Sequence, residues 1–303
     1  EKALPLLERA VRHPQAGPRT RLHWIQVLYM LGRVEQGSQA LNLHFDQLPR
    51  DAIALYNLSL PLMDAGDQEG VIRLLNRALS LQPEHPESHC NLGLVYQQKG
   101  ELALALRHLQ EGHRLGTARG NWPYDSKRWI DQVKNLIAVR AQIPQLLDGT
   151  FIPSDPKVFA IAGSLCSLQQ EHAAVFLLDQ RMKKADPNLN ISLSARSKLV
   201  KYESFLQAGF AQSRDAVRLS ERERVEARQQ ALAGLQVTVE FLRRMEQQGS
   251  PNNQREAQRW LKRLRESKTL AWTRDPQRIA GLPASERRGW YRFWQFLGDG
   301  AQP

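Results

Sequence analysis

The sequence predicts an all-α fold: a solenoid of antiparallel helical hairpins that ends in a C-terminal helical extension. Two series with a step of 34 residues support this prediction, one formed by Gly32, Gly66 and Gly100 and one by Pro49 and Pro83. Each glycine lies between two apolar stretches with helical spacing, and no stretch shows the alternation typical of a strand. Because one helical hairpin leaves an apolar face exposed, such units are expected to stack.

The composition agrees with a folded chain that is stabilised by packing. Of the 303 residues, 42% are hydrophobic and 24% are charged, and no apolar run approaches the roughly 18 residues of a membrane helix. Two cysteines, Cys90 and Cys166, are too few for a disulfide framework or a four-sulfur zinc site. The chain opens with Glu1 inside a predicted helix and shows no signal peptide. We interpret it as a fragment of a longer protein, in which a missing targeting signal carries little information, and we expect a cytoplasmic location.

The net charge of +11 is distributed unevenly along the chain. Residues 1–180 hold 18 Lys and Arg against 18 Asp and Glu, whereas residues 181–303 hold 24 against 13. A basic half is typical of proteins that bind nucleic acid, an anionic membrane surface or an acidic protein, and also of a solvated Arg-rich helix face.

The clearest repeat unit carries its small and large residues at fixed offsets, at Leu92, Gly93, Tyr96, Gly100, Ala105 and Leu109. This pattern resembles the tetratricopeptide repeat. The preceding unit matches it at Leu58, Ser59, Leu62, Gly66, Val71, Leu75, Ala78 and Pro83. An earlier unit is more degenerate, with Gly37 where Ala is usual, and residues 2–14 fit the second helix of a truncated repeat. The resemblance implies a right-handed superhelix over residues 1–117; a generic array of helical hairpins is the alternative.

Three further regions follow the repeats. Residues 118–150 are predicted to form a capping helix, begun by Asp125 or Ser126, and a linker that includes a loop over 145–153. Residues 151–190 read as another hairpin of tetratricopeptide type, with a helix start at Asp155-Pro156. Residues 191–303 are predicted to be a basic helical region.

Within this basic region a helix is expected near 194–209, and Ser220 with Glu223 forms a capping box that opens a long helix to about Gln247. An Arg-rich helix is expected over 252–270, followed by two short terminal helices.

A second resemblance rests on blocks found in order along the chain: Trp122-Pro123-Tyr124 to Trp129, Ile143 to Gly149, Ala185-Asp186-Pro187, and Thr273 to Pro283 with Glu286, Arg287 and Trp290. Together they resemble the carboxy-terminal tetratricopeptide region of planctomycete-type bacterial serine/threonine protein kinases, over most of 86–297. The chain departs from that family at 202–208, where Tyr-Glu-Ser-Phe-Leu-Gln-Ala replaces a Tyr-Asn-Ala-Ala-Cys stretch. The resemblance implies a partner-recruiting or regulatory region of a kinase.

The sequence predicts no catalytic residue, metal or cofactor for this chain. It contains no Gly-rich nucleotide loop with its lysine and no H-R-D or D-F-G motif, so a kinase domain would lie elsewhere in the parent protein. His89 and Cys90 are adjacent and point to different sides of a helix, and His108 and His113 are five residues apart, so neither pair has the spacing of shared metal ligands. An enzyme built from scattered residues is the rival hypothesis.

The tetratricopeptide resemblance implies a concave groove lined by the first helix of each hairpin. Carried over by register, the groove positions are Arg19, Leu22, His23, Gln26, Tyr29, Met30, Ile53, Tyr56, Asn57, Leu60, Met63, Asp64, Glu87, Cys90, Asn91, Leu94, Gln97 and Gln98. The amides of Asn57 and Asn91 can bond a peptide backbone, although both also fit as ordinary consensus residues. Since Arg19 is the one Lys or Arg in this set, a clamp for a peptide carboxy-terminus is not indicated.

The sequence therefore predicts a non-catalytic scaffold that binds a peptide or partner protein in this groove. The alternative is an adaptor that binds nucleic acid through a basic patch near Trp260 and Trp272, made of Arg255, Arg259, Lys262, Arg263 and Lys268. A third interpretation is that these side chains are a solvated helix face, because Trp260, Leu261 and Leu264 have the spacing of a buried stripe.

Overall fold

The computed structural model describes residues 4–187 and 195–298, and the regular structure of these residues is entirely helical. The all-α prediction is confirmed. None of the helices in this part of the chain has the length and apolar character needed to cross a membrane. The chain divides into two compact units, unit 1 over residues 1–138 and unit 2 over residues 139–303. Their boundary lies within helix α8 (Ser126–Asp148).

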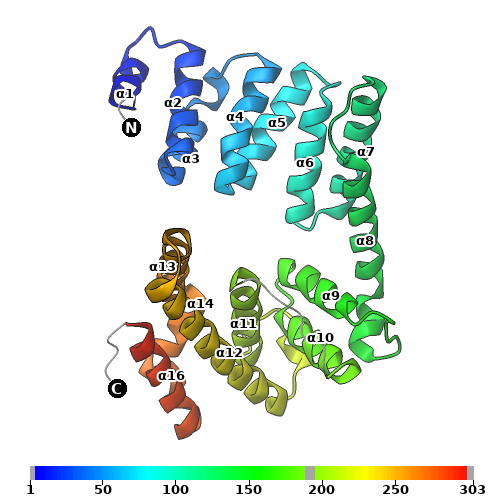
Figure 1. Cartoon of the computed structure of the whole chain (residues 1–303), viewed down its shortest axis with the longest axis vertical. Helices are drawn as coiled ribbons and strands as arrows, with labels where there is room; N and C mark the ends of the chain where they lie inside the picture. Colours follow the sequence, from blue (N-terminus) through cyan, green and yellow to red (C-terminus); the bar gives the residue numbers. More distant parts are fainter. Residues whose placement is uncertain (1–3, 188–194, 299–303) are drawn as a thin grey trace. The chain divides into compact units, whose positions relative to one another are not determined.

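Unit 1 is a stack of helical hairpins. Its helices before α8 are α1 (Leu4–Arg12), α2 (Pro18–Met30), α3 (Val34–His44), α4 (Ala52–Ala65), α5 (Gln68–Leu81), α6 (Pro86–Gln98) and α7 (Leu102–Ala118). Figure 1 shows α2 with α3, α4 with α5 and α6 with α7 as successive antiparallel pairs, and α5 packs in turn on α6. This is the tetratricopeptide-like solenoid that the 34-residue period predicts.

The repeated glycines and aspartates explain why the chain turns where it does. Gly32, Gly66 and Gly100 have φ angles of +72°, +78° and +77°, a left-handed conformation that a side chain opposes. Asp51 and Asp67 cap α4 and α5, accepting hydrogen bonds from the backbone N–H of Ala54 and Gly70 at 3.1 and 2.9 Å. The α4–α5 hairpin therefore has local signals for its turn and for both helix starts, and the left-handed turn glycine recurs in the other two hairpins.

Unit 2 continues with hairpins and ends in a helical cluster. Its helices after α8 are α9 (Lys157–Leu168), α10 (His172–Ala185), α11 (Ala195–Gly209), α12 (Glu221–Gln248), α13 (Pro251–Glu266), α14 (Lys268–Ala271), α15 (Pro276–Ile279) and α16 (Ala284–Leu297). Helices α9 and α10 form one pair and α11 and α12 another, while α13 and α16 both pack on α12 (Figure 1). The large side chains of Trp290, Phe293 and Trp294 are buried in the terminal cluster.

The predicted start of the long helix in unit 2 is confirmed. Ser220 accepts a hydrogen bond from the Glu223 backbone N–H at 3.4 Å, and the Glu223 carboxylate accepts one from the Ser220 backbone N–H at 2.8 Å, which is a capping box. The helix ends one residue beyond the predicted Gln247.

Two other predictions are wrong. The loop over 145–153 begins later, because α8 continues through Pro144 to Asp148, where full burial of Leu146 anchors the last turn. The helix over 252–270 breaks at Ser267, whose hydroxyl caps α14 by accepting from the Leu270 backbone N–H at 3.3 Å. The predicted region boundary at 190/191 lies outside the described residues.

Candidate partner-binding surface

The first helices of the three complete hairpins in unit 1 present a surface that we call the A-helix face. It is formed by residues of α2, α4 and α6 in four columns with a step of 34: Arg19, Ile53 and Glu87; His23, Asn57 and Asn91; Gln26, Leu60 and Leu94; Met30, Asp64 and Gln98. All of these side chains are exposed or half-buried. The predicted groove residues Tyr56, Met63 and Gln97 are half-buried beside them.

Apolar and polar side chains alternate on the A-helix face. Met30 at the end of α2 is 70% exposed, and Ile53 and Leu60 on α4 are 57% and 38% exposed. The exposed amide of Asn57 makes no hydrogen bond to another described residue. The face therefore offers apolar anchor points together with a free donor and acceptor.

Three residues assigned to the groove by register lie instead in the protein interior. Leu22 and Tyr29 are 6% and 4% exposed and belong to the core of unit 1, and Cys90 is 3% exposed beside Gly112. The consensus register marks a helix face, but part of that face packs on the second helix of the same hairpin, as Tyr29 does at Gly37 and Cys90 at Gly112. Burial raises the pKa of the Cys90 thiol to about 12, so this cysteine stays protonated.

Tyr29 has a structural role that its position in the repeat did not suggest. Its hydroxyl donates a hydrogen bond to the carboxylate of Asp67, the residue that caps α5 in the next hairpin. Burial, with the contribution of Asp67, raises the pKa of the Tyr29 phenol far above its usual range. Tyr29 thus links two hairpins, and it requires Gly37, because a Cβ at Gly37 would lie 2.7 Å from the Tyr29 ring.

An aromatic and acidic group lies at the end of the A-helix face formed by α4 and α6. The rings of Tyr56 and His85 have centroids 5.0 Å apart, and Glu87 lies 3.5 Å from Arg119. Burial raises the pKa of Tyr56; Tyr124 and Glu87 add to the increase, and a side-chain hydrogen bond with Asn91 opposes it. Of the two predicted amide groups, Asn91 is therefore already engaged.

Tyr124 is a surface residue that the 34-residue register missed. It is 46% exposed in the segment between α7 and α8, and its ring centroid lies 4.9 Å from that of Trp122. Trp122 in turn donates a hydrogen bond to the Ser126 hydroxyl at 2.8 Å. This segment interrupts the 34-residue period, so the register could not assign Tyr124 to the surface. The Trp122-Pro123-Tyr124 block, which carries the kinase resemblance, is the sequence signal that could have identified it.

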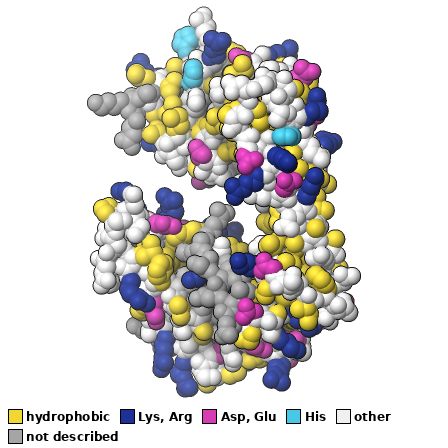
Figure 2. Space-filling view, turned by 45° about the vertical axis from the view of Figure 1, so that its right-hand side comes forward, with side chains coloured by type: hydrophobic (Ala, Val, Ile, Leu, Met, Phe, Trp, Pro, Cys, Tyr) yellow, Lys and Arg dark blue, Asp and Glu magenta, His cyan; other side chains and the backbone are white. Residues whose placement is uncertain are grey.

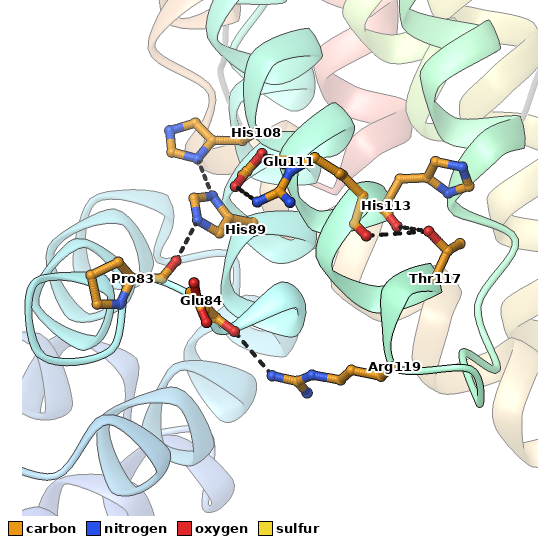
Figure 3. A network of polar contacts seen from close by, with 9 residues as sticks. Pro83, Glu84, His89, His108, Glu111, His113, Thr117 and Arg119 are labelled. Carbon is orange, nitrogen blue, oxygen red and sulfur yellow. Dashed lines mark hydrogen bonds and ion pairs between the residues drawn. The ribbon is translucent and has the colours of Figure 1, made fainter.

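The structure brings together two histidines, His89 and His108, that were not paired in the sequence analysis. Figure 3 shows His89 of α6 facing His108 of α7, with their Nδ1 atoms 3.1 Å apart, and His89 Nε2 lies 3.0 Å from the carbonyl oxygen of Pro83. Burial, followed by the influence of His89 and Arg107, lowers the pKa of His108 to about 4. Among the described residues, no group of three His, Cys, Asp or Glu side chains is arranged to hold a metal ion.

The predicted basic patch lies in unit 2, where Lys and Arg side chains are interspersed with Asp and Glu on the face shown in Figure 2. Arg259, Lys262, Arg263 and Lys268 line one open cavity of about 550 Å³. Arg255 is exposed one turn earlier on α13 and does not line the cavity.

The fold defines a helical-repeat protein. Residues 62–100 match the family model described as TPR repeat, that is, the tetratricopeptide repeat. The match covers the turn of the α4–α5 hairpin, the whole of α5 and the whole of α6. The chain therefore contains a tetratricopeptide repeat, as predicted.

Two curated proteins are similar to parts of the chain. A probable biofilm formation methyltransferase, WspC of Pseudomonas putida, is 30% identical over 118 residues, which are 38% of this chain and 28% of that protein. The photosystem I assembly protein Ycf3 of Prochlorococcus marinus is 31% identical over 70 residues, which are 23% of this chain and 40% of that protein. The chain thus spans well under half of either relative.

Proposed function

We propose that this chain is a non-catalytic scaffold that binds a segment of a partner protein on the A-helix face of unit 1. The observation that supports the proposal is the exposure of Met30, Ile53 and Leu60 among polar side chains on helices held in a fixed stack. Apolar anchors that a partner covers supply most of the binding free energy, while polar groups such as the Asn57 amide set its register.

The proposal extends to the context of the chain in a longer protein. The kinase-like blocks from Trp122 onward support a recruiting or regulatory region attached to a bacterial serine/threonine protein kinase domain. The free, buried thiols of Cys90 and Cys166 fit a reducing compartment, which for this protein would be the cytoplasm.

The experiment is a selection of a displayed random-peptide library against the full chain, followed by titration calorimetry with the selected peptides. We expect Ile53→Glu and Leu60→Glu each to weaken binding by about tenfold or more, because each places a charge where a partner's apolar side chain would lie. The matched control is Leu81→Glu on α5, because Leu81 is 42% exposed and lies outside the A-helix face.

Retained helicity in all three variants, measured by circular dichroism, would show that only the surface has changed. Equal affinities of the two A-helix variants and the wild-type chain for every selected peptide would show that this face is not the binding surface. Equal weakening by Leu81→Glu would have the same meaning.

A further inference from the structure

A charged cavity of unit 2 is separate from the A-helix face and is not used by the function proposed above. It has a volume of about 550 Å³ and is formed by α11, α13, α14 and the residue between the last two. Its lining residues are Glu203, Arg259, Lys262, Arg263, Glu266, Ser267, Lys268 and Thr269.

The cavity is lined by four positive and two negative side chains and so has a formal net charge of +2. Within the described part of the chain, Arg259, Arg263 and Lys268 have no carboxylate partner at ion-pair distance. Lys262 and Glu266 are 3.9 Å apart with side chains 72% and 65% exposed, an arrangement that contributes little to stability. The cavity therefore has three unpaired cationic side chains available to an anionic ligand.

The remaining carboxylate is held at the wall of the cavity. Glu203 of α11 accepts a hydrogen bond from the Ser267 hydroxyl at 2.7 Å, and Gln207 donates one to the Thr269 hydroxyl at 3.3 Å. These contacts hold the short segment before α14 against α11, and Lys268 with it. Arg259 and Arg263 are four residues apart on α13 and so project from the same face of that helix.

The aromatic side chains near the cavity are not free to stack on bases. The Arg263 guanidinium lies over the Trp260 ring, 5.2 Å from its centroid, and Arg278 lies 4.1 Å from the centroid of Trp272. Single-stranded nucleic acid is bound by exposed aromatic rings in a continuous basic groove. Here an arginine guanidinium lies over each of the two rings, and Glu203 and Glu266 would repel a continuous phosphate backbone.

A guanidinium that lies over a ring still presents its N–H groups in its own plane, where they can bind a carboxylate. Arg259 and Arg263 can therefore each donate charge-assisted hydrogen bonds to a separate carboxylate, and Lys268 lines the same cavity. Separate carboxylates on a flexible chain can also avoid the two acidic residues of the cavity.

We propose that this cavity binds the carboxylate side chains of an acidic segment of a partner protein. The site is a second docking point, and its occupant differs in chemistry from the apolar anchors expected at the A-helix face. Binding here does not depend on the function proposed for unit 1, and variants of the two surfaces separate the two proposals.

The test uses the full chain and a fluorescein-labelled oligoglutamate peptide of about ten residues, the length of a short interaction segment, in fluorescence anisotropy at about 50 mM salt, where charge pairs are weakly screened. We expect measurable binding that falls when Arg259→Gln and Arg263→Gln are combined, by about tenfold or more, because two charge-assisted contacts are lost. An oligoglutamine peptide of equal length is expected not to bind.

The matched control is the double variant Arg222→Gln with Arg244→Gln, which removes the same charge from exposed positions of α12 outside the cavity. It should change the affinity for oligoglutamate less than about twofold, a residual field effect of distant charges. Equal losses in the two double variants would overturn the proposal, as would no binding of oligoglutamate. Tighter binding of an oligothymidylate than of oligoglutamate would also overturn the proposal and favour nucleic acid as the ligand. If free inorganic phosphate alone displaced the oligoglutamate peptide, the cavity would be a simple anion site and the proposal would be rejected.

Discussion

At the scale of single residues, Gly37 is the clearest case of a departure from the repeat pattern that the structure explains. The position usually holds Ala, but a Cβ there would lie 2.7 Å from Cε2 of Tyr29. Tyr29 cannot move freely, because its hydroxyl is bonded to Asp67 of the next hairpin. The glycine is thus the consequence of a large ring at the interface of α2 and α3.

We predict that Gly37→Ala lowers the free energy of unfolding of unit 1 by about 1–3 kcal/mol, the usual cost of overpacking a core. In an open helical position the same change stabilises by about 0.5–1 kcal/mol, so the sign of the effect is diagnostic. Gly163→Ala in α9 is the matched control, because nothing lies within 4 Å of the added methyl group. Urea unfolding followed by circular dichroism measures both, and a stabilising Gly37→Ala would contradict the packing argument.

The buried side chain of His108, which faces the half-buried His89, predicts a dependence of stability on pH. The pKa of His108 is about 4 in the folded chain, below the value of 6.5 for an unperturbed imidazole, so the folded state resists binding this proton. The contribution of His108 to the free energy of unfolding is therefore fully present above about pH 6.5, where the imidazole is neutral in both states. It is lost as the pH falls toward 4, because the unfolded chain then binds a proton that the folded chain resists. The groups that face His108 are His89 and the stacked ring of Tyr96, with Arg107 nearby.

We expect the melting temperature to fall between pH 6.5 and 4, and the fall to be shallower in His108→Phe, which keeps a ring against Tyr96 but cannot be protonated. The exposed His13 provides the control, since His13→Gln should leave the slope of melting temperature against pH unchanged. The lowered pKa values of His85 and His172 act in the same direction, so part of the slope remains. A slope equal to that of the wild-type chain in His108→Phe would exclude His108 as its source.

At the scale of helices, α10 obtains its N-terminal cap from a distant part of the chain. Its N-cap residue, Glu171, makes no side-chain capping bond, and the Asp215 carboxylate accepts hydrogen bonds from the backbone N–H groups of Ala173 and Ala174 at 3.1 and 2.8 Å. Asp215 lies between α11 and α12, so this contact ties the α11–α12 connection to the previous hairpin. A capping carboxylate also interacts favourably with the helix dipole.

Asp215→Ala should therefore destabilise unit 2 by about 1–2 kcal/mol, because two buried N–H groups lose their acceptor. Asp215→Asn should lose less, since the amide oxygen can still accept one of the two bonds. Thermal unfolding of the wild-type chain, Asp215→Asn and Asp215→Ala gives their order of stability. An Asp215→Ala variant as stable as the wild-type chain would show that the cap does not contribute to stability.

A buried ion pair joins three helices of unit 2. Arg228 of α12 donates to Glu286 of α16 at 2.8 Å and to the carbonyl oxygen of Gly209, the last residue of α11, at 2.7 Å. Both charged side chains are almost fully buried. Gly209 permits this approach, because a Cβ there would lie 2.5 Å from Cγ of Arg228.

Removing one partner of such a pair leaves the other charge buried without a partner. We therefore predict that Arg228→Met lowers the free energy of unfolding of unit 2 by about 3–5 kcal/mol. The double variant Arg228→Met with Glu286→Leu should recover a large part of this loss, because no charge is then left in the interior. A double-mutant cycle from urea unfolding measures the coupling. Additive effects of the two substitutions would mean that the pair does not interact in solution.

At the scale of the whole chain, the sequence predicted unit 1 more completely than unit 2, for a physical reason. The hairpins of unit 1 are specified locally by Gly32, Gly66 and Gly100 and repeat with one period, so each supports the assignment of the next. In unit 2 the capping box of Ser220 was equally local and was predicted correctly. The Asp215 cap joins residues some 40 positions apart, a contact that no local pattern encodes.

The candidate site was predicted in outline and differs in detail for a similar reason. The register placed Ile53, Asn57 and Leu60 on a surface, and they are exposed. It also placed Leu22 and Tyr29 there, although both are buried in the core that the helices of unit 1 share. A repeat consensus describes one hairpin, whereas burial depends on how adjacent hairpins pack together.

The last prediction concerns how far a local change spreads along the chain. Each hairpin of a solenoid contacts mainly its neighbours, and each of the two units has its own buried core, so destabilisation should stay within one unit. Gly37→Ala should therefore increase amide hydrogen exchange in α2 to α5 and leave α9 to α16 unchanged, while Asp215→Ala should do the reverse. Hydrogen-exchange mass spectrometry at peptide resolution distinguishes these patterns. If either variant increased exchange evenly across both units, the chain would unfold as a single cooperative body and the continuous helix α8 would transmit stability from one unit to the other.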